Sequence, residues 1–89
     1  MRRAARIDLN HREIVDALRD IGASVESLAS VGKGCPDILV GYCGINYLIE
    51  IKSTGGKKTE YQKAWHDKWR GAVNTVYSAD EAVEIITRS

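Results

Sequence analysis

The chain has 89 residues, 44% of them hydrophobic, so it predicts a single small domain, residues 1–89, with a modest core. It has no apolar run near the ~18 residues of a membrane span, and its arginine-rich start lacks the apolar segment of a signal peptide. We therefore expect a cytoplasmic protein without a membrane partner. The net charge of +1 hides a cluster of cations in residues 52–70, a pattern that a solvated surface also shows.

The first predicted element is a helix over residues 10–21, in which apolar side chains recur at helical spacing up to a glycine. Residues 25–31 alternate loosely between polar and apolar and predict a strand. After a glycine loop, residues 37–42 and 45–52 predict two more strands, joined by a tight turn into an antiparallel hairpin. The two cysteines lack the spacing of metal ligands and are expected to be reduced thiols.

The second half of the chain predicts a helix, a strand and a helix. Residues 59–70 are amphipathic, and the Trp65 and Trp69 side chains are expected to anchor this helix to the core. Residues 73–77 predict a short strand, and Ser78 is expected to cap a last helix. The order α-β-β-β-α-β-α predicts an α/β fold with a small mixed sheet flanked by helices.

The predicted hairpin poses an electrostatic problem. If its turn lies at residues 43–44, Asp37 falls directly opposite Glu50, and like charges in that position destabilise a sheet. A positive charge between them would remove the difficulty. Lys52 projects from the same face, and a divalent cation such as Mg²⁺ is often held by one or two carboxylates. The pattern therefore indicates either a metal site or a surface cluster of two acids and a lysine.

The residues around this hairpin resemble a known family. Pro36-Asp37, 12 intervening residues and then Glu50-Ile51-Lys52 resemble the PD-(D/E)xK signature of metal-dependent nucleases. The longer run "GCPDILVG", "YLIEIKS" and "TEYQKAWHDKW" is similar to the VRR-NUC (virus-type replication-repair nuclease) family, over nearly the whole chain.

The resemblance implies a restriction-endonuclease-like PD-(D/E)xK fold, as in the archaeal Holliday junction resolvases. It implies a DNA endonuclease that depends on Mg²⁺ or Mn²⁺ and prefers branched DNA such as Holliday junctions or flaps. Because the resolvases act as dimers, we expect a homodimer. Small stand-alone members of the family occur in phages, so the expected location is the cytoplasm of a bacterium or of a phage's host.

The expected catalytic centre follows from the chemistry of phosphodiester hydrolysis. Asp37 and Glu50 are predicted metal ligands, and the backbone carbonyl of Ile51 is a third candidate. Lys52 is expected to orient or activate the attacking water and to offset phosphate charge.

The resemblance suggests further residues from the helices, each with a structural alternative. Gln62 is expected to steady the lysine or the water, although it also completes a capping box with Thr59. Glu13 is the expected acid from the first helix, although it also forms a capping-type pair with the asparagine three residues earlier. His11 is an alternative to Glu13, and His66, one turn beyond Gln62, is a weaker candidate.

The glycines and cations of the two loops are expected to contact DNA. Lys33, Lys57 and Lys58 can neutralise phosphates, and Gly34 can let the backbone of a nucleic acid approach. No element resembles a base-reading helix, so recognition of shape and backbone is expected. Two alternatives are a non-catalytic DNA-binding or assembly module with a vestigial nuclease site, and a structural domain without nucleic acid.

Overall fold

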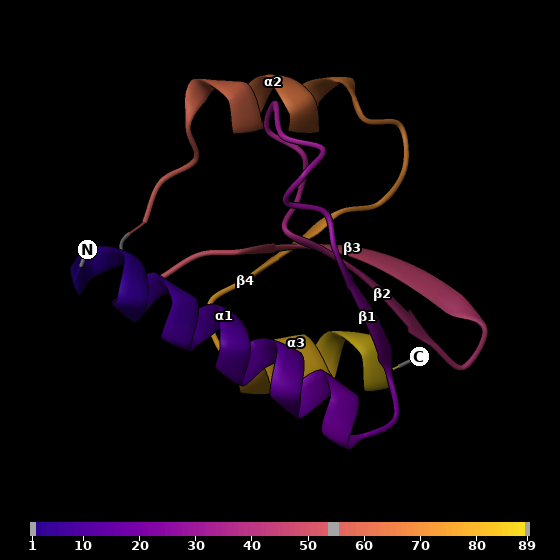
Figure 1. The fold of residues 1–89 in the computed structure, drawn as a ribbon. Coiled ribbons are helices and arrows are strands. Elements are labelled where there is room, and N and C mark those ends of the chain that lie inside the picture. The colour runs from indigo at the N-terminus through magenta and orange to yellow at the C-terminus, as the bar shows by residue number, and fades with distance from the viewer. Residues whose placement is uncertain (1, 54–55, 89) are drawn as a thin grey trace.

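The computed structural model describes residues 2–53 and 56–88. This part of the chain has the predicted order of elements, α-β-β-β-α-β-α (Figure 1). The elements are α1 Arg2–Asp20, β1 Ser24–Ser27, β2 Ile38–Tyr42, β3 Ile45–Ile51, α2 Glu60–Lys68, β4 Asn74–Val76 and α3 Ala79–Thr87. None of the helices in residues 2–53 and 56–88 has the length and apolar content needed to cross a bilayer.

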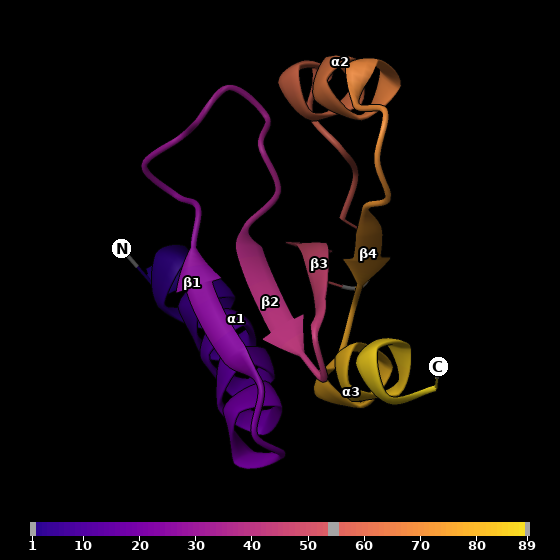
Figure 2. The same ribbon diagram turned by 90° about the vertical axis from the view of Figure 1, so that its right-hand side faces the viewer.

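The four strands form one mixed sheet in the order β1-β2-β3-β4 (Figure 2). β1, β2 and β3 pair antiparallel, whereas β4 pairs parallel to β3. A parallel neighbour needs a crossover connection, and residues 52–73, which include α2, supply it. This connection carries α2 to the side of the sheet opposite α1 and α3 (Figure 1).

The hydrophobic core lies between the sheet and the helices α1 and α3. Alternate residues of β2 and β3 point into it, and Ile38, Val40 and Ile49 are fully buried there. The helices contribute Ile14 and Leu18 from α1, with Ala82 and Ile86 from α3. One face of the hairpin therefore packs against the helices, and the opposite face of the sheet is left free for polar residues.

The hairpin turn has the predicted position and sets the register of the two strands. Cys43 and Gly44 both have positive φ angles, 51° and 81°, as the two central residues of a type I′ turn require. Tyr42 consequently faces Ile45, and Ile38 faces Ile49.

Two predicted elements differ from the structure by more than two residues at one end. α1 begins at Arg2 rather than at residue 10, because residues 2–9 are mostly alanine, arginine and other good helix formers. Asn10 is therefore inside the helix and does not cap it, so the capping interpretation of Glu13 is wrong. β1 ends at Ser27, where the Ser27 hydroxyl accepts a hydrogen bond from the Ala29 N–H and the chain turns away.

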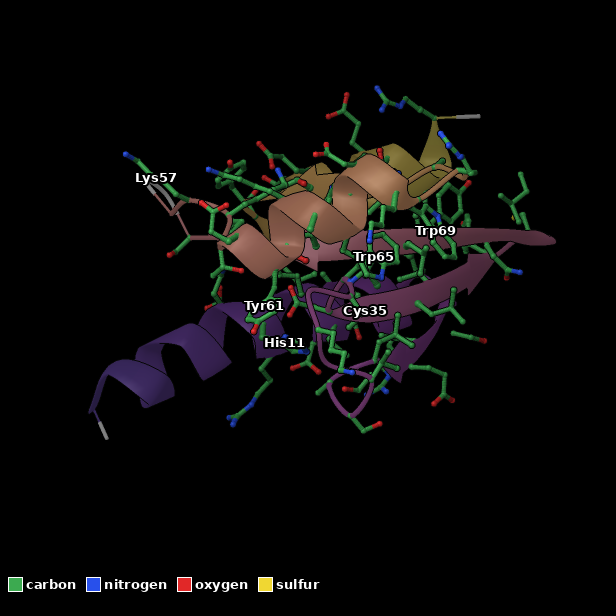
Figure 3. All side chains as sticks on the ribbon, turned by 90° about the horizontal axis from the view of Figure 1, so that it is seen from above. His11, Cys35, Lys57, Tyr61, Trp65 and Trp69 are labelled. Carbon is green, nitrogen blue, oxygen red and sulfur yellow. The ribbon has the colours of Figure 1, made fainter. Side chains whose placement is uncertain are left out.

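The prediction that the tryptophans of α2 anchor it to the core is wrong. No residue of α2 is buried, and neither tryptophan is part of the core cluster. Trp65 and Trp69 instead stack on each other, with ring centroids 4.6 Å apart and an angle of 17° between the planes. Trp69 remains 45% exposed, and Tyr61 at the other end of the helix is 74% exposed (Figure 3).

α2 is held by its first turn rather than by an apolar stripe. Gly34, at φ 85°, lies against this turn so closely that an added Cβ atom would collide with the Tyr61 carbonyl and lie 2.9 Å from the Gln62 nitrogen. A glycine at position 34 is therefore required for the loop to pack against α2.

Candidate active site

The paired carboxylates lie where the register predicts them. Asp37 immediately precedes β2, and because Ile38 pairs with Ile49, the next position outward sets Asp37 opposite Glu50. The Asp37 Oδ2 atom accepts a hydrogen bond of 2.7 Å from the N–H of Ile51, which fixes the carboxylate against β3. Asp37 is partly exposed, whereas Glu50 is only 1% exposed.

Glu50 is the buried charged residue of the described chain, and its two oxygens differ. Its Oε2 accepts a hydrogen bond of 2.6 Å from the Gln62 side-chain amide, and the Lys52 ammonium lies 3.6 Å from the same oxygen. Its Oε1 is buried and has no hydrogen-bond partner among the residues that the structure describes. A buried polar atom without a partner is costly, so this oxygen is available to a ligand.

Gln62 connects the helix α2 to the site. Its Oε1 accepts hydrogen bonds from the Lys52 ammonium at 2.7 Å and from the Thr59 backbone N–H at 2.8 Å, while its amide nitrogen donates to Glu50. The Thr59 hydroxyl in turn accepts a hydrogen bond from the Gln62 backbone N–H, which completes the predicted capping box. A single conformation of Gln62 therefore both caps α2 and contacts Lys52 and Glu50.

The electrostatics of the site centre on Glu50. Burial, followed by the nearby Asp37 charge, raises the pKa of Glu50 to about 7, although Lys52 and Lys58 oppose this shift. Burial also raises the pKa of the Cys35 thiol, and the charges of Glu50 and Asp37 act in the same direction. Cys35 therefore stays a thiol beside the carboxylates, and both it and Cys43 are free.

The residues present fit a hard divalent cation. The donors at the site are carboxylate oxygens, and no described residue bonds to the Glu50 Oε1 atom. Within residues 2–53 and 56–88, no three His, Cys, Asp or Glu side chains gather in a way that could hold a metal ion. A cation here would therefore be held by Asp37 and Glu50, with the Ile51 carbonyl and water as the remaining ligands.

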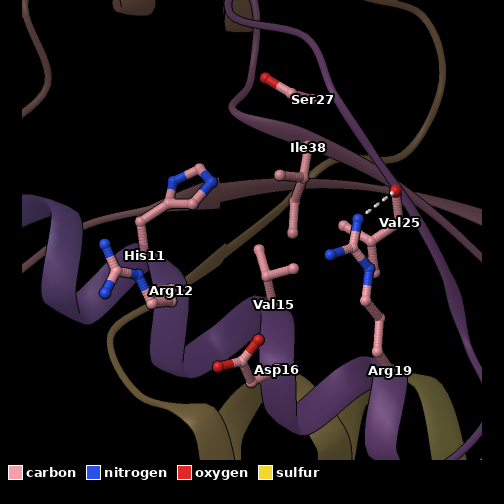
Figure 4. A pocket seen from close by; sticks show the side chains of 8 residues that line it. All are labelled: His11, Arg12, Val15, Asp16, Arg19, Val25, Ser27 and Ile38. Carbon is pink, nitrogen blue, oxygen red and sulfur yellow. Dashed lines mark hydrogen bonds between the residues drawn. The ribbon is translucent and has the colours of Figure 1, made fainter.

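On α1, His11 lies toward the sheet, whereas Glu13, which the sequence favoured, does not. Glu13 is exposed, and no hydrogen bond or ion pair of the described residues joins it to the carboxylates. His11 is partly buried and lines a cavity of about 340 Å³ between α1 and the start of β2, together with Val15 and Ile38 (Figure 4). The role of Glu13 remains a prediction from the resemblance.

His66 lies on α2 one turn beyond Gln62. Burial and the neighbouring Lys58 lower its pKa, Asp67 opposes the shift, and Lys52 adds to it. Its Nε2 atom is buried and has no hydrogen-bond partner among the described residues. The ring meets Trp65 edge to face, with centroids 5.8 Å apart, so His66 is packed against Trp65.

The predicted DNA-contacting residues lie on the two loops beside the carboxylates. Lys33 and Lys57 are exposed, and Lys58 is partly buried (Lys57 is labelled in Figure 3). The carbonyl of Lys57 accepts a hydrogen bond of 3.3 Å from the Lys52 ammonium, so this loop also positions the lysine of the site. Gly34 packs against α2, a role that the sequence did not reveal.

The fold and this site can be compared with known proteins. A solved structure described as "VRR_NUC domain" matches with a TM-score of 0.72, over 90% of this chain and 92% of that chain, at 23% sequence identity. The chain has the VRR_NUC fold. No protein-family model and no curated protein sequence matches it.

The VRR_NUC fold was predicted from the resemblance of the three longer sequence runs to that family, and the hydrogen bond from Lys52 to Gln62 agrees with the steadying role that the resemblance suggests for Gln62. The hydrogen bond from Gln62 to Glu50 was not predicted, because it depends on where the crossover places α2, which the sequence does not specify. The Thr59-x-x-Gln62 pattern was the available signal, because a capping glutamine is held in one conformation.

The raised pKa of Glu50 predicts a pH-dependent stability. The pKa is about 7 in the folded chain against an ordinary value of 4.5, so between these values the folded protein keeps a proton that the unfolded chain has released. In EDTA, the free energy of unfolding should fall by about 3 kcal/mol as the pH rises from about 4.5 to about 7. Urea denaturation of the wild type and Glu50→Gln across this range measures the effect.

The comparison with Glu50→Gln isolates the contribution of this one carboxyl group. His66, whose pKa is lowered, contributes with the opposite sign and is present in both proteins. The difference between the two stability curves should therefore grow with pH in favour of Glu50→Gln. Parallel curves would contradict the assignment.

Proposed function

We propose that this chain is a metal-dependent DNA endonuclease of the VRR-NUC type, with residues 1–89 forming one nuclease domain. The observation that carries the proposal is the buried Glu50 carboxylate opposite Asp37, with one oxygen held by Gln62 and the other without a partner in the part of the chain that the structure describes. A protein gains no stability from such a pair, because both burial and the neighbouring charge oppose ionisation. The presence of this unfavourable pair supports a role for the carboxylates in binding a cation.

Asp37 and Glu50, with the Ile51 carbonyl, would hold Mg²⁺ or Mn²⁺. When bound, such a cation supplies a Lewis acid for the phosphate and lowers the pKa of a water ligand. Positive charge at the carboxylates also favours the ionised form of Glu50, so the proton that Glu50 carries near neutral pH is released on binding.

Lys52 is the cation that the chain itself supplies. Hydrogen bonds to the Gln62 side chain and the Lys57 carbonyl fix its ammonium 3.6 Å from Glu50 Oε2. In this position it can orient the attacking water and offset the charge that develops on the phosphate. Gln62 acts as a positioning residue for both Lys52 and Glu50.

The proposed substrate is branched DNA, such as a Holliday junction or a flap. Lys33, Lys57 and Lys58 lie on loops beside the carboxylates, where each can neutralise a phosphate. Contacts of this kind position a nucleic acid without reading its sequence. Selection by shape is the mode of recognition that such a surface supports.

Removal of Glu50 should separate cleavage from binding. Glu50→Ala removes a metal ligand and a negative charge, so cleavage of a labelled four-way junction in Mg²⁺ or Mn²⁺ should fall by about 10³-fold or more. Binding of the same junction in EDTA should not weaken. Glu84→Ala, which removes an exposed acid of α3 on the other side of the sheet, is the matched control and should keep wild-type cleavage.

Two outcomes of this experiment would argue against the proposed nuclease function. A wild-type rate in Glu50→Ala contradicts the nuclease site. A wild-type protein that binds the junction but leaves it intact with either metal supports a DNA-binding module with a vestigial site.

We also propose a homodimer, because a symmetric junction presents two equivalent strands and each chain offers one site. The two terminal helices, α1 and α3, are the candidate interface, although Val83 and Ile85 of α3 pack against the core of their own chain. Light scattering at micromolar concentration should give twice the 9.9 kDa of one chain. A monomer that cuts four-way junctions would contradict the dimer.

A further inference from the structure

The face of the sheet that carries Asp37 and Glu50 also has a hollow, near the C-terminal end of α2, which we call the Trp69 hollow. It has a volume of about 430 Å³, within the ~300–1,000 Å³ of pockets that take small molecules. Its lining includes Leu39, Asn46, Leu48, Trp69, Gly71 and Ala72. Nothing in the proposed chemistry uses it.

The hollow and the carboxylates share one face of the sheet. Leu39 and Leu48 are cross-strand partners, and each lies two residues from one member of the Asp37–Glu50 pair. Two residues along a strand span ~6.6–6.8 Å, and their side chains point to the same face. A strand of stacked DNA advances ~3.4 Å per nucleotide, so a chain bound at the carboxylates reaches the hollow within about two nucleotides.

The Trp69 ring is placed for stacking. One of its faces is covered by Trp65 at 4.6 Å, yet the side chain lines the hollow and remains 45% exposed (Figure 3). Gly71 makes room for the indole, because a Cβ atom there would lie 2.9 Å from the Trp69 ring nitrogen. Trp65 thereby covers one face of the ring, Gly71 lies against the ring nitrogen, and the exposed remainder of the indole is available to a flat partner.

The charge beside the hollow favours a nucleic acid over a second copy of this chain. Lys68 and Arg70, on either side of Trp69 in the sequence, are exposed. In a two-fold contact the same patch meets itself, so these cations would face like charges. An exposed aromatic ring with cations beside it is the combination that binds single-stranded nucleic acid.

We propose that the Trp69 hollow receives an unpaired base within about two nucleotides of the scissile phosphate. This inference rests on the proposed nuclease function and narrows its substrate to DNA with an unpaired or easily extruded nucleotide close to the cleavage position. A base inside a regular duplex must first be unstacked and unpaired, whereas a base in a bulge, flap or branch point is already free or nearly so. The hollow therefore gives this chain a means of selecting shape without reading sequence.

The first arm of the test compares cleavage of two duplexes that differ only in a three-thymidine bulge. The wild type should prefer the bulged duplex, and Trp69→Ala should raise KM for it about tenfold with little effect on the paired duplex. Trp69→Phe should restore most of the preference. Tyr61→Ala, which removes an exposed aromatic ring from the other end of α2, is the matched control and should keep it.

The second arm measures binding without cleavage. In Trp65→Phe, Trp69 is the remaining tryptophan, and a single-stranded oligothymidylate in EDTA should quench its fluorescence saturably. Absence of quenching, or a bulge preference unchanged in Trp69→Ala, overturns the inference. A change from dimer to monomer in Trp69→Ala also overturns it, because the hollow would then be a subunit interface.

The two arms distinguish this inference from the function on which it rests. If the wild type cuts neither duplex with Mg²⁺ or Mn²⁺ yet quenching occurs, the base site stands and the nuclease proposal fails. Because Trp69 lies outside the core, Trp69→Ala should stay folded, which circular dichroism checks.

Discussion

The structure depends on one constraint, the burial of the Glu50 carboxylate directly opposite a second acid. Such a pair opposes folding, since burial and the neighbouring Asp37 both favour the protonated form. The chain offsets this with two partners from different segments, Lys52 directly after β3 and Gln62 on α2. One carboxylate oxygen is nevertheless left without a partner among the described residues, and the proposed cation would remove that residual cost.

The burial of Glu50 is tolerable because the two faces of the sheet differ, one being apolar and covered by helices and the other polar. Helices α1 and α3 bury the apolar face, where Ile38, Val40 and Ile49 are completely enclosed. Most of the stability therefore comes from one side, and α2, which buries none of its residues, is free to carry Gln62 and the stacked tryptophans over the other. The site face can thus be polar and open without removing the support of the fold.

Local patterns specified some features well. The turn at residues 43–44 needs positive φ angles, and once it is placed, alternation along the strands leaves Asp37 and Glu50 with one possible register. Features set by distant packing were not available from such patterns. The exposure of the tryptophans and the contact of Gly34 with α2 depend on where the helices lie relative to the sheet.

The central claim is that Glu50 is buried in order to bind a cation. Titration calorimetry of Mn²⁺ into the metal-free protein at pH 6.5, in two buffers of different ionisation enthalpy, tests it most directly. The account predicts one Mn²⁺ per chain with release of most of one proton, and at least about tenfold weaker binding without that proton in Glu50→Gln. Equal affinity and equal proton release in the two proteins, or no binding by the wild type, would contradict it.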